Sequence, residues 1–310
     1  MTIKYLDAAR QGKNQWWRYI SILTVVPFVP VCCVSIGLTI WLHFFVNVSF
    51  SDLQNKVLVS KIIRTMPPGG IYLLTISLTS SICACILLGI QKIHQRDFLA
   101  TICPNHKFNV DRYTKAFIVW FLISLLFRIL QLKLDPQAFQ DFKLVFKPID
   151  WSIYLVPAII NAISIAFCTE VIRGYVLQGL GTIVRHKYLL IFTSSLLSSS
   201  FVLLIANKAQ CSQLQCLVFN LILGIGLATA ILFENSLELV LGIQTAANLV
   251  PIFLTYQYSE TLPSSLPTIF SATLNSQLIS SIESTAIVVL SIKLAIFYAI
   301  LLRKTPTINV

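Results

Sequence analysis

The chain has 310 residues, of which 56% are hydrophobic and only 11% are charged, and its mean hydropathy is +0.80. Soluble domains carry about a quarter of charged residues, so this composition excludes an ordinary water-soluble domain and predicts a membrane protein. The formal net charge of +11 does not indicate a nucleic-acid partner, because the Lys and Arg residues fall between apolar runs, where they orient helices and attract anionic lipid headgroups.

The polar, basic segment 1–18 opens the chain, and we expect it to lie in the cytoplasm. The apolar run behind it is too long for the core of a signal peptide and has no small-residue cleavage site after it, so it is expected to stay as the first membrane helix. Residues 19–302 are expected to form one transmembrane domain, and 303–310 a C-terminal tail, because no long polar stretch remains for a second domain.

Eight apolar runs follow one another along the chain. About 20 apolar residues are needed to cross the hydrocarbon core, where helical hydrogen bonds must satisfy the backbone. The sequence therefore predicts an all-α, polytopic membrane protein of about eight transmembrane helices. In chain order the expected spans are Tyr19–Phe45, Ile71–Ile90, Thr114–Leu132, Trp151–Leu180, Tyr188–Asn207, Cys216–Phe233, Leu237–Tyr256 and Ser284–Leu302.

The basic residues between these runs predict the orientation. Lys and Arg are retained on the cytoplasmic side, which places segments 1–18, 91–115, 185–187 and 303–310 there, together with both termini. Segment 258–283 has no Lys or Arg and is expected outside. Segment 131–150 carries three lysines yet also falls outside, and the spacing of Phe139, Phe142, Val145 and Phe146 predicts an interfacial amphipathic helix. The membrane is expected to be a bacterial plasma membrane or a thylakoid-type inner membrane.

Several polar side chains fall inside the predicted spans, where ionisable groups are costly. Arg128 and Lys293 lie near helix ends and are interpreted as snorkelling residues or an ion pair. Glu234 and Glu238 bracket a short connection that is expected to be a solvated turn. Glu170 and Arg173 are three residues apart on one helix face and form a candidate ion pair.

Gln244 and Asn248 lie one turn apart on a later predicted span. Amide side chains of this kind can hydrogen-bond between helices and hold a bundle together. They can equally line a polar cavity within the membrane, and the sequence leaves both interpretations open.

Three of these segments match a motif set in order and spacing. Residues 169–180 read TEVIRGYVLQGL, 201–205 read FVLLI and 241–249 read LGIQTAANL. Together they resemble the Glu-Glu-x-x-x-Arg, Phe-x-x-x-His and His-x-x-x-Asn/Asp motifs of the CPBP (CAAX protease and bacteriocin-processing, or Abi) intramembrane metalloproteases. The resemblance covers most of the chain and is strongest over 168–251. It implies a CAAX-protease-like bundle whose motif-bearing core is 151–256.

The chain departs from that family where the metal would bind. With Arg173 aligned, Cys168 and Thr169 occupy the Glu-Glu positions, or else one glutamate survives as Glu170; Ile205 and Gln244 replace the two histidines. Catalytic zinc needs about three protein ligands, and neither a hydrocarbon nor a neutral amide is a good one. Arg173, Phe201 and Asn248 are retained. The comparison implies that no metal or other cofactor is bound and that no residue can be assigned a catalytic role.

We therefore expect a proteolytically inactive CPBP homologue that binds a membrane protein, a prenylated or otherwise hydrophobic peptide, or a lipid. The alternative is a divergent intramembrane metalloendopeptidase that uses Glu170 and zinc. A transporter has less support, because the charges form no stripe or ring along several helices. The residues expected to line the intramembrane cavity are Thr169, Glu170, Arg173, Phe201, Gln244 and Asn248.

Overall fold

The structure is a computed structural model, and it describes residues 4–10, 12–45, 68–104, 107–134, 139–144, 148–205, 213–258, 270–274 and 279–302. The N-terminal part contains α1 (Lys4–Asp7), a 3-10 helix η1 (Ala8–Arg10), α2 (Trp16–Phe45), α5 (Pro68–Ile93), α6 (Leu99–Ile102) and α7 (Val110–Leu134). After these come α8 (Pro148–Gly181), α9 (Lys187–Ile205), α10 (Gln213–Glu234), α11 (Glu238–Phe253) and α12 (Ile279–Leu302). The strands are β1 (Phe139–Leu144), β2 (Leu254–Tyr258) and β3 (Phe270–Leu274).

Each of the eight expected spans overlaps a helix, although 206–207 of the fifth expected span lie outside the described residues. Among the described residues, five segments are long and apolar enough to cross a membrane: Trp16–Phe44, Tyr72–Ile93, Val110–Gln131, Leu155–Gly181 and Leu217–Glu234. The apolar segment of α12, Ile287–Ile300, is shorter. The prediction of a polytopic helical membrane protein is thus supported, whereas the number of helices that cross the bilayer stays a prediction.

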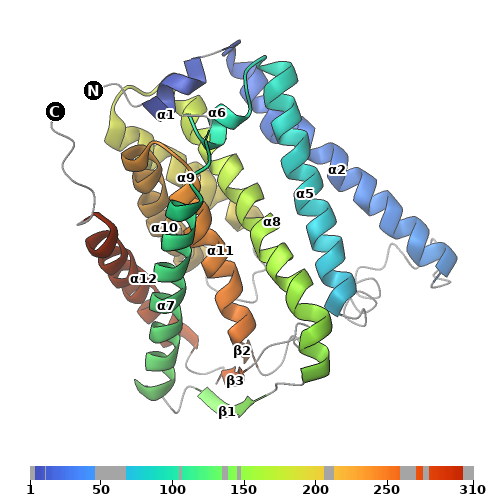
Figure 1. Ribbon diagram of the computed structural model, residues 1–310, viewed down its shortest axis with the longest axis vertical. Helices are drawn as coiled ribbons and strands as arrows, with labels where there is room; N and C mark the ends of the chain where they lie inside the picture. Colours follow the sequence, from blue (N-terminus) through green and yellow to red (C-terminus); the bar gives the residue numbers. More distant parts are fainter. Residues whose placement is uncertain are drawn as a thin grey trace.

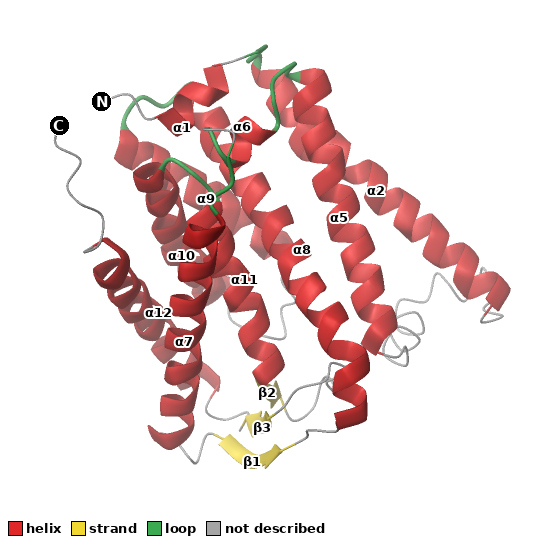
Figure 2. Cartoon of the chain, viewed as in Figure 1, coloured by secondary structure: helices red, strands yellow, loops and turns green. Residues whose placement is uncertain are grey.

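The helices lie side by side in a bundle (Figure 1). α11 packs against both α7 and α8, α5 packs between α8 and α2, and α9 packs against α10. α1, α6, the start of α2 and the end of α5 lie at one end, and the strands lie at the other (Figure 2). Three of the segments expected on the cytoplasmic side therefore meet at one end, because the N-terminal segment and the turns after α5 and α8 pack together there.

A small sheet closes the opposite end of the bundle. Its strand order is β1-β3-β2, with β1 antiparallel and β2 parallel to β3. The prediction of an amphipathic helix over 139–146 is wrong, because Phe139–Leu144 is a strand. The expected span Leu237–Tyr256 is also too long, since the helix ends at Phe253 and the chain continues into β2. Both segments form strands because they pair with residues far along the chain. A local hydrophobic pattern carries no information about such pairing.

The N-terminal segment packs onto the bundle instead of extending from it as a tail. Tyr5 is completely buried, and its hydroxyl donates a 2.8 Å hydrogen bond to the carbonyl of Thr101. The side-chain amide of Gln178 donates to the Tyr5 carbonyl at 3.2 Å. Gly174 leaves room for this ring, because a Cβ there would overlap the Tyr5 hydroxyl and lie 2.9 Å from Leu237 Cδ1. Segment 4–10 is thus part of the folded core.

The turn between α10 and α11 is also built into this end. Glu238 is buried, and its Oε1 accepts hydrogen bonds from the Asn109 amide at 2.8 Å and from the Cys103 thiol at 3.3 Å. Glu234 forms a 3.3 Å ion pair with Arg112. The expectation of a solvated turn is therefore wrong for Glu238. Its carboxylate lies in the first turn of α11, where the helix dipole and free amides favour a negative charge.

Candidate functional site

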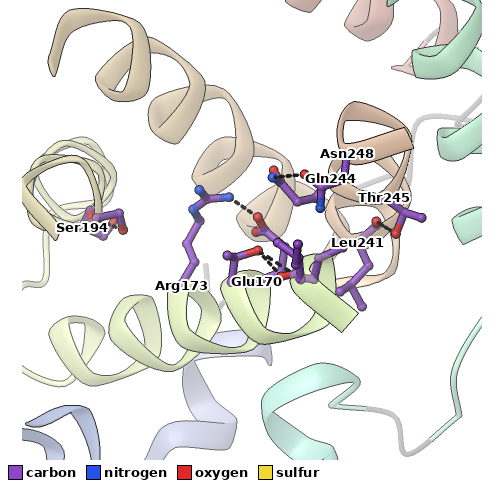
Figure 3. Close-up of polar contacts among 11 residues, drawn as sticks. Glu170, Arg173, Ser194, Leu241, Gln244, Thr245 and Asn248 are labelled. Carbon is purple, nitrogen blue, oxygen red and sulfur yellow. Dashed lines mark hydrogen bonds and ion pairs between the residues drawn. The ribbon is translucent and has the colours of Figure 1, made fainter. Parts of the chain in front are cut away.

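The candidate site begins with an ion pair on α8. Glu170 is 0% exposed, and its Oε1 accepts a hydrogen bond from Nη1 of Arg173, which lies one turn further along the helix and is 16% exposed at its side chain. Figure 3 shows both side chains rising from α8 toward α11. The candidate ion pair expected from the three-residue spacing is confirmed, and it neutralises two charges that are costly inside a membrane helix.

The facing helix contributes a hydrogen-bonded pair of amides. Gln244 Nε2 lies 3.4 Å from Asn248 Oδ1, one turn away on α11. Asn248 Nδ2 then donates to the carbonyl of Ala162 on α8 at 3.2 Å, so this pair joins the two helices (Figure 3). α11 itself is held close to α7, because the Cβ that Gly242 lacks would overlap the Tyr113 carbonyl. The tight packing fixes the position of both amides.

Unused hydrogen-bonding capacity surrounds these residues. Within the described part of the chain, the buried atoms Glu170 Oε2 and Arg173 Nε have no hydrogen-bond partner, and the same holds for Asn161 Oδ1 and the Tyr72 hydroxyl. Tyr72 comes from α5 and packs against Ala158 and Ala162 of α8 and Leu249 of α11. Buried polar groups are normally satisfied, so these unpaired groups on α8 and α5 mark places where a polar ligand or water can bind.

Other expected site residues lie elsewhere. Thr169 is exposed, and its hydroxyl donates to the Ile165 carbonyl of its own helix at 2.8 Å. Phe201 and Ile205 lie in the last turn of α9, and their side chains are outside the described part of the structure. The structure therefore associates Glu170, Arg173, Gln244 and Asn248 at the α8–α11 interface, and it does not link Thr169 to them by a hydrogen bond among the described residues.

The described side chains also bear on whether a metal ion could bind. Across the described ranges, no group of three or more His, Cys, Asp or Glu side chains is arranged to hold a metal ion. Cys168 is buried near Cys83, and both remain free thiols.

The side chain of Lys293 lies with its Nζ 5.6 Å from the centre of the Phe127 ring, which gives this cation an aromatic neighbour.

A second polar network, which the sequence did not predict, lies where the N-terminal segment meets α8. His94 Nδ1 lies 2.7 Å from the Lys13 carbonyl, and its Nε2 lies 2.6 Å from the Tyr175 hydroxyl. Because a carbonyl only accepts, Nδ1 carries the proton and Nε2 accepts from the tyrosine. Arg96 Nη2 donates to Gln178 Oε1 at 3.0 Å. Tyr175 and Gln178 belong to the GYVLQ sequence after Arg173, and here they anchor the N-terminal segment.

Burial shifts the pKa values of His94 and Cys103 at this end of the bundle. It lowers the pKa of His94 to about 4, and the charges of Arg96 and Arg18 act in the same direction, although the bond to the Lys13 carbonyl opposes them. Burial also raises the pKa of the Cys103 thiol to about 12, helped by the carboxylate of Glu238. At neutral pH the imidazole is therefore uncharged and the thiol protonated.

The chain is similar in sequence to a bacterial protein. A protein of Bacillus subtilis (strain 168), described as uncharacterized protein YyaK, is 24% identical over 186 residues. The match covers 58% of this chain and 58% of that protein, so the chain spans less than two thirds of its relative. No family model matches the chain, and no solved structure is similar to it.

Proposed function

We propose that the chain is a proteolytically inactive member of the CPBP family that binds a membrane partner at the α8–α11 interface. The observation that carries this proposal is the buried Glu170–Arg173 ion pair beside Gln244 and Asn248, where each charged side chain keeps a polar atom that no described residue pairs with. The occupant would be a segment of a membrane protein, a hydrophobic or prenylated peptide, or a lipid. Its polar atoms would use the free Glu170 oxygen and the free Arg173 N–H.

The same residues argue against hydrolysis. One oxygen of Glu170 already accepts a hydrogen bond from Arg173, and Gln244 offers only an amide at a position where the family has histidine. Without zinc no bound water has its pKa lowered toward neutrality, so there is no nucleophile for a peptide bond. The retained Arg173 and Asn248 would serve in packing and in hydrogen bonding to the occupant.

Zinc content separates an inactive homologue from the alternative, a divergent metalloendopeptidase. Purified full-length protein should contain far less than one zinc per chain by mass spectrometry of the metal. Stoichiometric zinc that a chelator removes, together with peptide-bond cleavage that is lost in Glu170→Gln, would instead establish the enzyme.

Restoring the missing donors tests the family assignment itself. The double variant Ile205→His/Gln244→His should gain chelatable zinc, because two imidazoles and the Glu170 carboxylate supply about three ligands. Each single variant is the matched control and should bind much less. No zinc in a folded double variant would mean that these positions do not converge, and the CPBP assignment would then be wrong.

A further inference from the structure

The guanidinium of Arg96 is buried with part of its hydrogen-bonding capacity unused. Arg96 is only 5% exposed, and its Nε and Nη1 have no hydrogen-bond partner among the described residues. Nη2 donates to Gln178, the group lies 5.7 Å from the centre of the Tyr175 ring, and the Tyr19 hydroxyl is also close enough to interact with the guanidinium. A neutral amide and an aromatic face compensate a buried cation only in part.

Two carboxylates lie in the neighbourhood of Arg96 without pairing with it: Asp97 is the next residue in the chain, and Glu170 acts electrostatically on the same Tyr5. Among the described residues, no ion pair includes Arg96. Burial raises the pKa of Tyr5 well above its usual value, so this phenol keeps its proton despite the opposing charge of Arg96. His94 is neutral, and the nearby Arg18 adds a further positive charge. An arginine with free N–H groups in such surroundings is suited to a phosphate or carboxylate.

The backbone holds Arg96 in this position. Gln95 adopts a left-handed conformation with φ of 55°, which costs energy for a residue other than glycine. Gly12, with φ of 87°, lies directly over the turn, because a Cβ there would be 3.2 Å from Arg96 Cβ and would overlap the His94 carbonyl. The Lys13 amide also donates to that carbonyl at 2.8 Å. Loop 12–15, in which Asn14 is half-buried and the other residues are exposed, therefore packs over the backbone and Cβ of Arg96.

The surroundings of this loop indicate a lipid. Trp16 and Trp17 follow it at the start of α2 and are both exposed, and Arg18 lies 4.9 Å from the centre of the Trp17 ring. Tryptophan and arginine at the end of a spanning helix are typical of the level of lipid headgroups. Lys13 and Lys92 are exposed at the same end of the bundle. The phosphate groups of anionic lipids are therefore the anions most concentrated here.

We propose that Arg96 binds the phosphate of an anionic phospholipid headgroup, which enters when loop 12–15 moves aside. The phosphate oxygens accept from Nε and Nη1 and neutralise the buried charge. This site is separate from the α8–α11 interface and does not depend on the function proposed for that interface.

The test uses the full-length protein in lipid nanodiscs of phosphatidylcholine, with or without phosphatidylglycerol. Wild type should unfold about 5 °C higher when phosphatidylglycerol is present, because a ligand that binds only the folded state raises Tm. Arg96→Gln should keep its Tm in pure phosphatidylcholine, since glutamine removes an uncompensated charge, and should lose the shift. Lys92→Gln is the matched control and should retain it.

A third arm adds inorganic phosphate to the phosphatidylcholine nanodiscs. The same rise in Tm there, again absent in Arg96→Gln, supports the anion site and assigns it to free phosphate. Equal Tm values in all three conditions, or equal loss of the shift in Arg96→Gln and Lys92→Gln, would overturn the proposal. If Arg96→Gln does not fold, native mass spectrometry of wild type replaces it: selective retention of phosphatidylglycerol over phosphatidylcholine supports the site, and loss of both lipids contradicts it.

Discussion

The Nε2 atom of His94 accepts a 2.6 Å hydrogen bond from the hydroxyl of Tyr175, which is 81 residues away in the chain. This bond joins the turn after α5 to the C-terminal part of α8. Together with the bond from Nδ1–H to the Lys13 carbonyl, it uses both ring nitrogens of a neutral imidazole.

The stability of the protein should fall in mild acid because of this imidazole. The folded state holds the pKa of His94 near 4, below the unfolded value of about 6.5, so only the unfolded chain takes up the proton between these values. The contribution of the neutral imidazole to the free energy of unfolding is fully present above about pH 6.5. This free energy decreases by about 3 kcal/mol as the pH falls toward 4. Chemical denaturation in detergent as a function of pH measures this slope.

Replacement of His94 by glutamine should reduce the slope in that window, at the cost of lower stability at neutral pH. His186, which is exposed, provides the control: His186→Gln should leave the slope as in wild type. An unchanged slope in His94→Gln would show that another group is responsible.

Breaking the Glu170–Arg173 ion pair should be more costly than breaking an exposed one. Arg173→Met leaves a fully buried carboxylate without its partner and should lower the free energy of unfolding by about 3 kcal/mol or more. Glu170→Gln/Arg173→Met should recover much of the loss, because no isolated charge remains. The control is the exposed pair Lys115–Asp111, where Lys115→Gln should cost less than about 1 kcal/mol. Additive effects of the two α8 substitutions would contradict a direct interaction.

A methyl group at Gly174 should separate the N-terminal segment from α8. Gly174→Ala would push against the Tyr5 ring and Leu237 and should destabilise the protein by about 1–3 kcal/mol. Gly37→Ala is the matched control, because nothing lies within 4 Å of its added Cβ and alanine favours a helix. In a protein that already carries Gly174→Ala, the further change Tyr5→Ala should lower the free energy of unfolding only slightly. Thermal unfolding and protease cleavage of the N-terminal segment would both report the change.

The thiol of Cys103 should resist alkylation. Burial and the Glu238 carboxylate raise its pKa to about 12, and only the thiolate reacts quickly. At pH 8, peptide mapping after N-ethylmaleimide treatment should find Cys103 unmodified in folded protein and modified after denaturation in detergent. A cysteine introduced at exposed Lys107 should label in both conditions. Rapid labelling of Cys103 in the folded protein would mean that the turn between α10 and α11 opens.

Composition and hydrophobic run length were sufficient to predict a polytopic helical membrane protein, because lipid leaves a chain of this kind few alternatives to helices. The spacing of Glu170 and Arg173 predicted their ion pair for an equally local reason, since residues three apart share a helix face. The orientation in the membrane and the CPBP resemblance remain predictions. The orientation depends on the charge bias of the loops, and the resemblance depends on the order of the motifs. Neither observation identifies a partner.

Only the tertiary structure placed the residues that are far apart in sequence. It paired β1 with β3, buried Tyr5 against Gly174, and joined His94 to Tyr175, and each contact spans well over 50 residues of chain. It also buried Glu238 and Arg96, which local sequence places in polar turns. The physical reason is the same throughout: hydrophobic periodicity fixes the local backbone, whereas the neighbours of a polar side chain depend on how helices pack across the bundle.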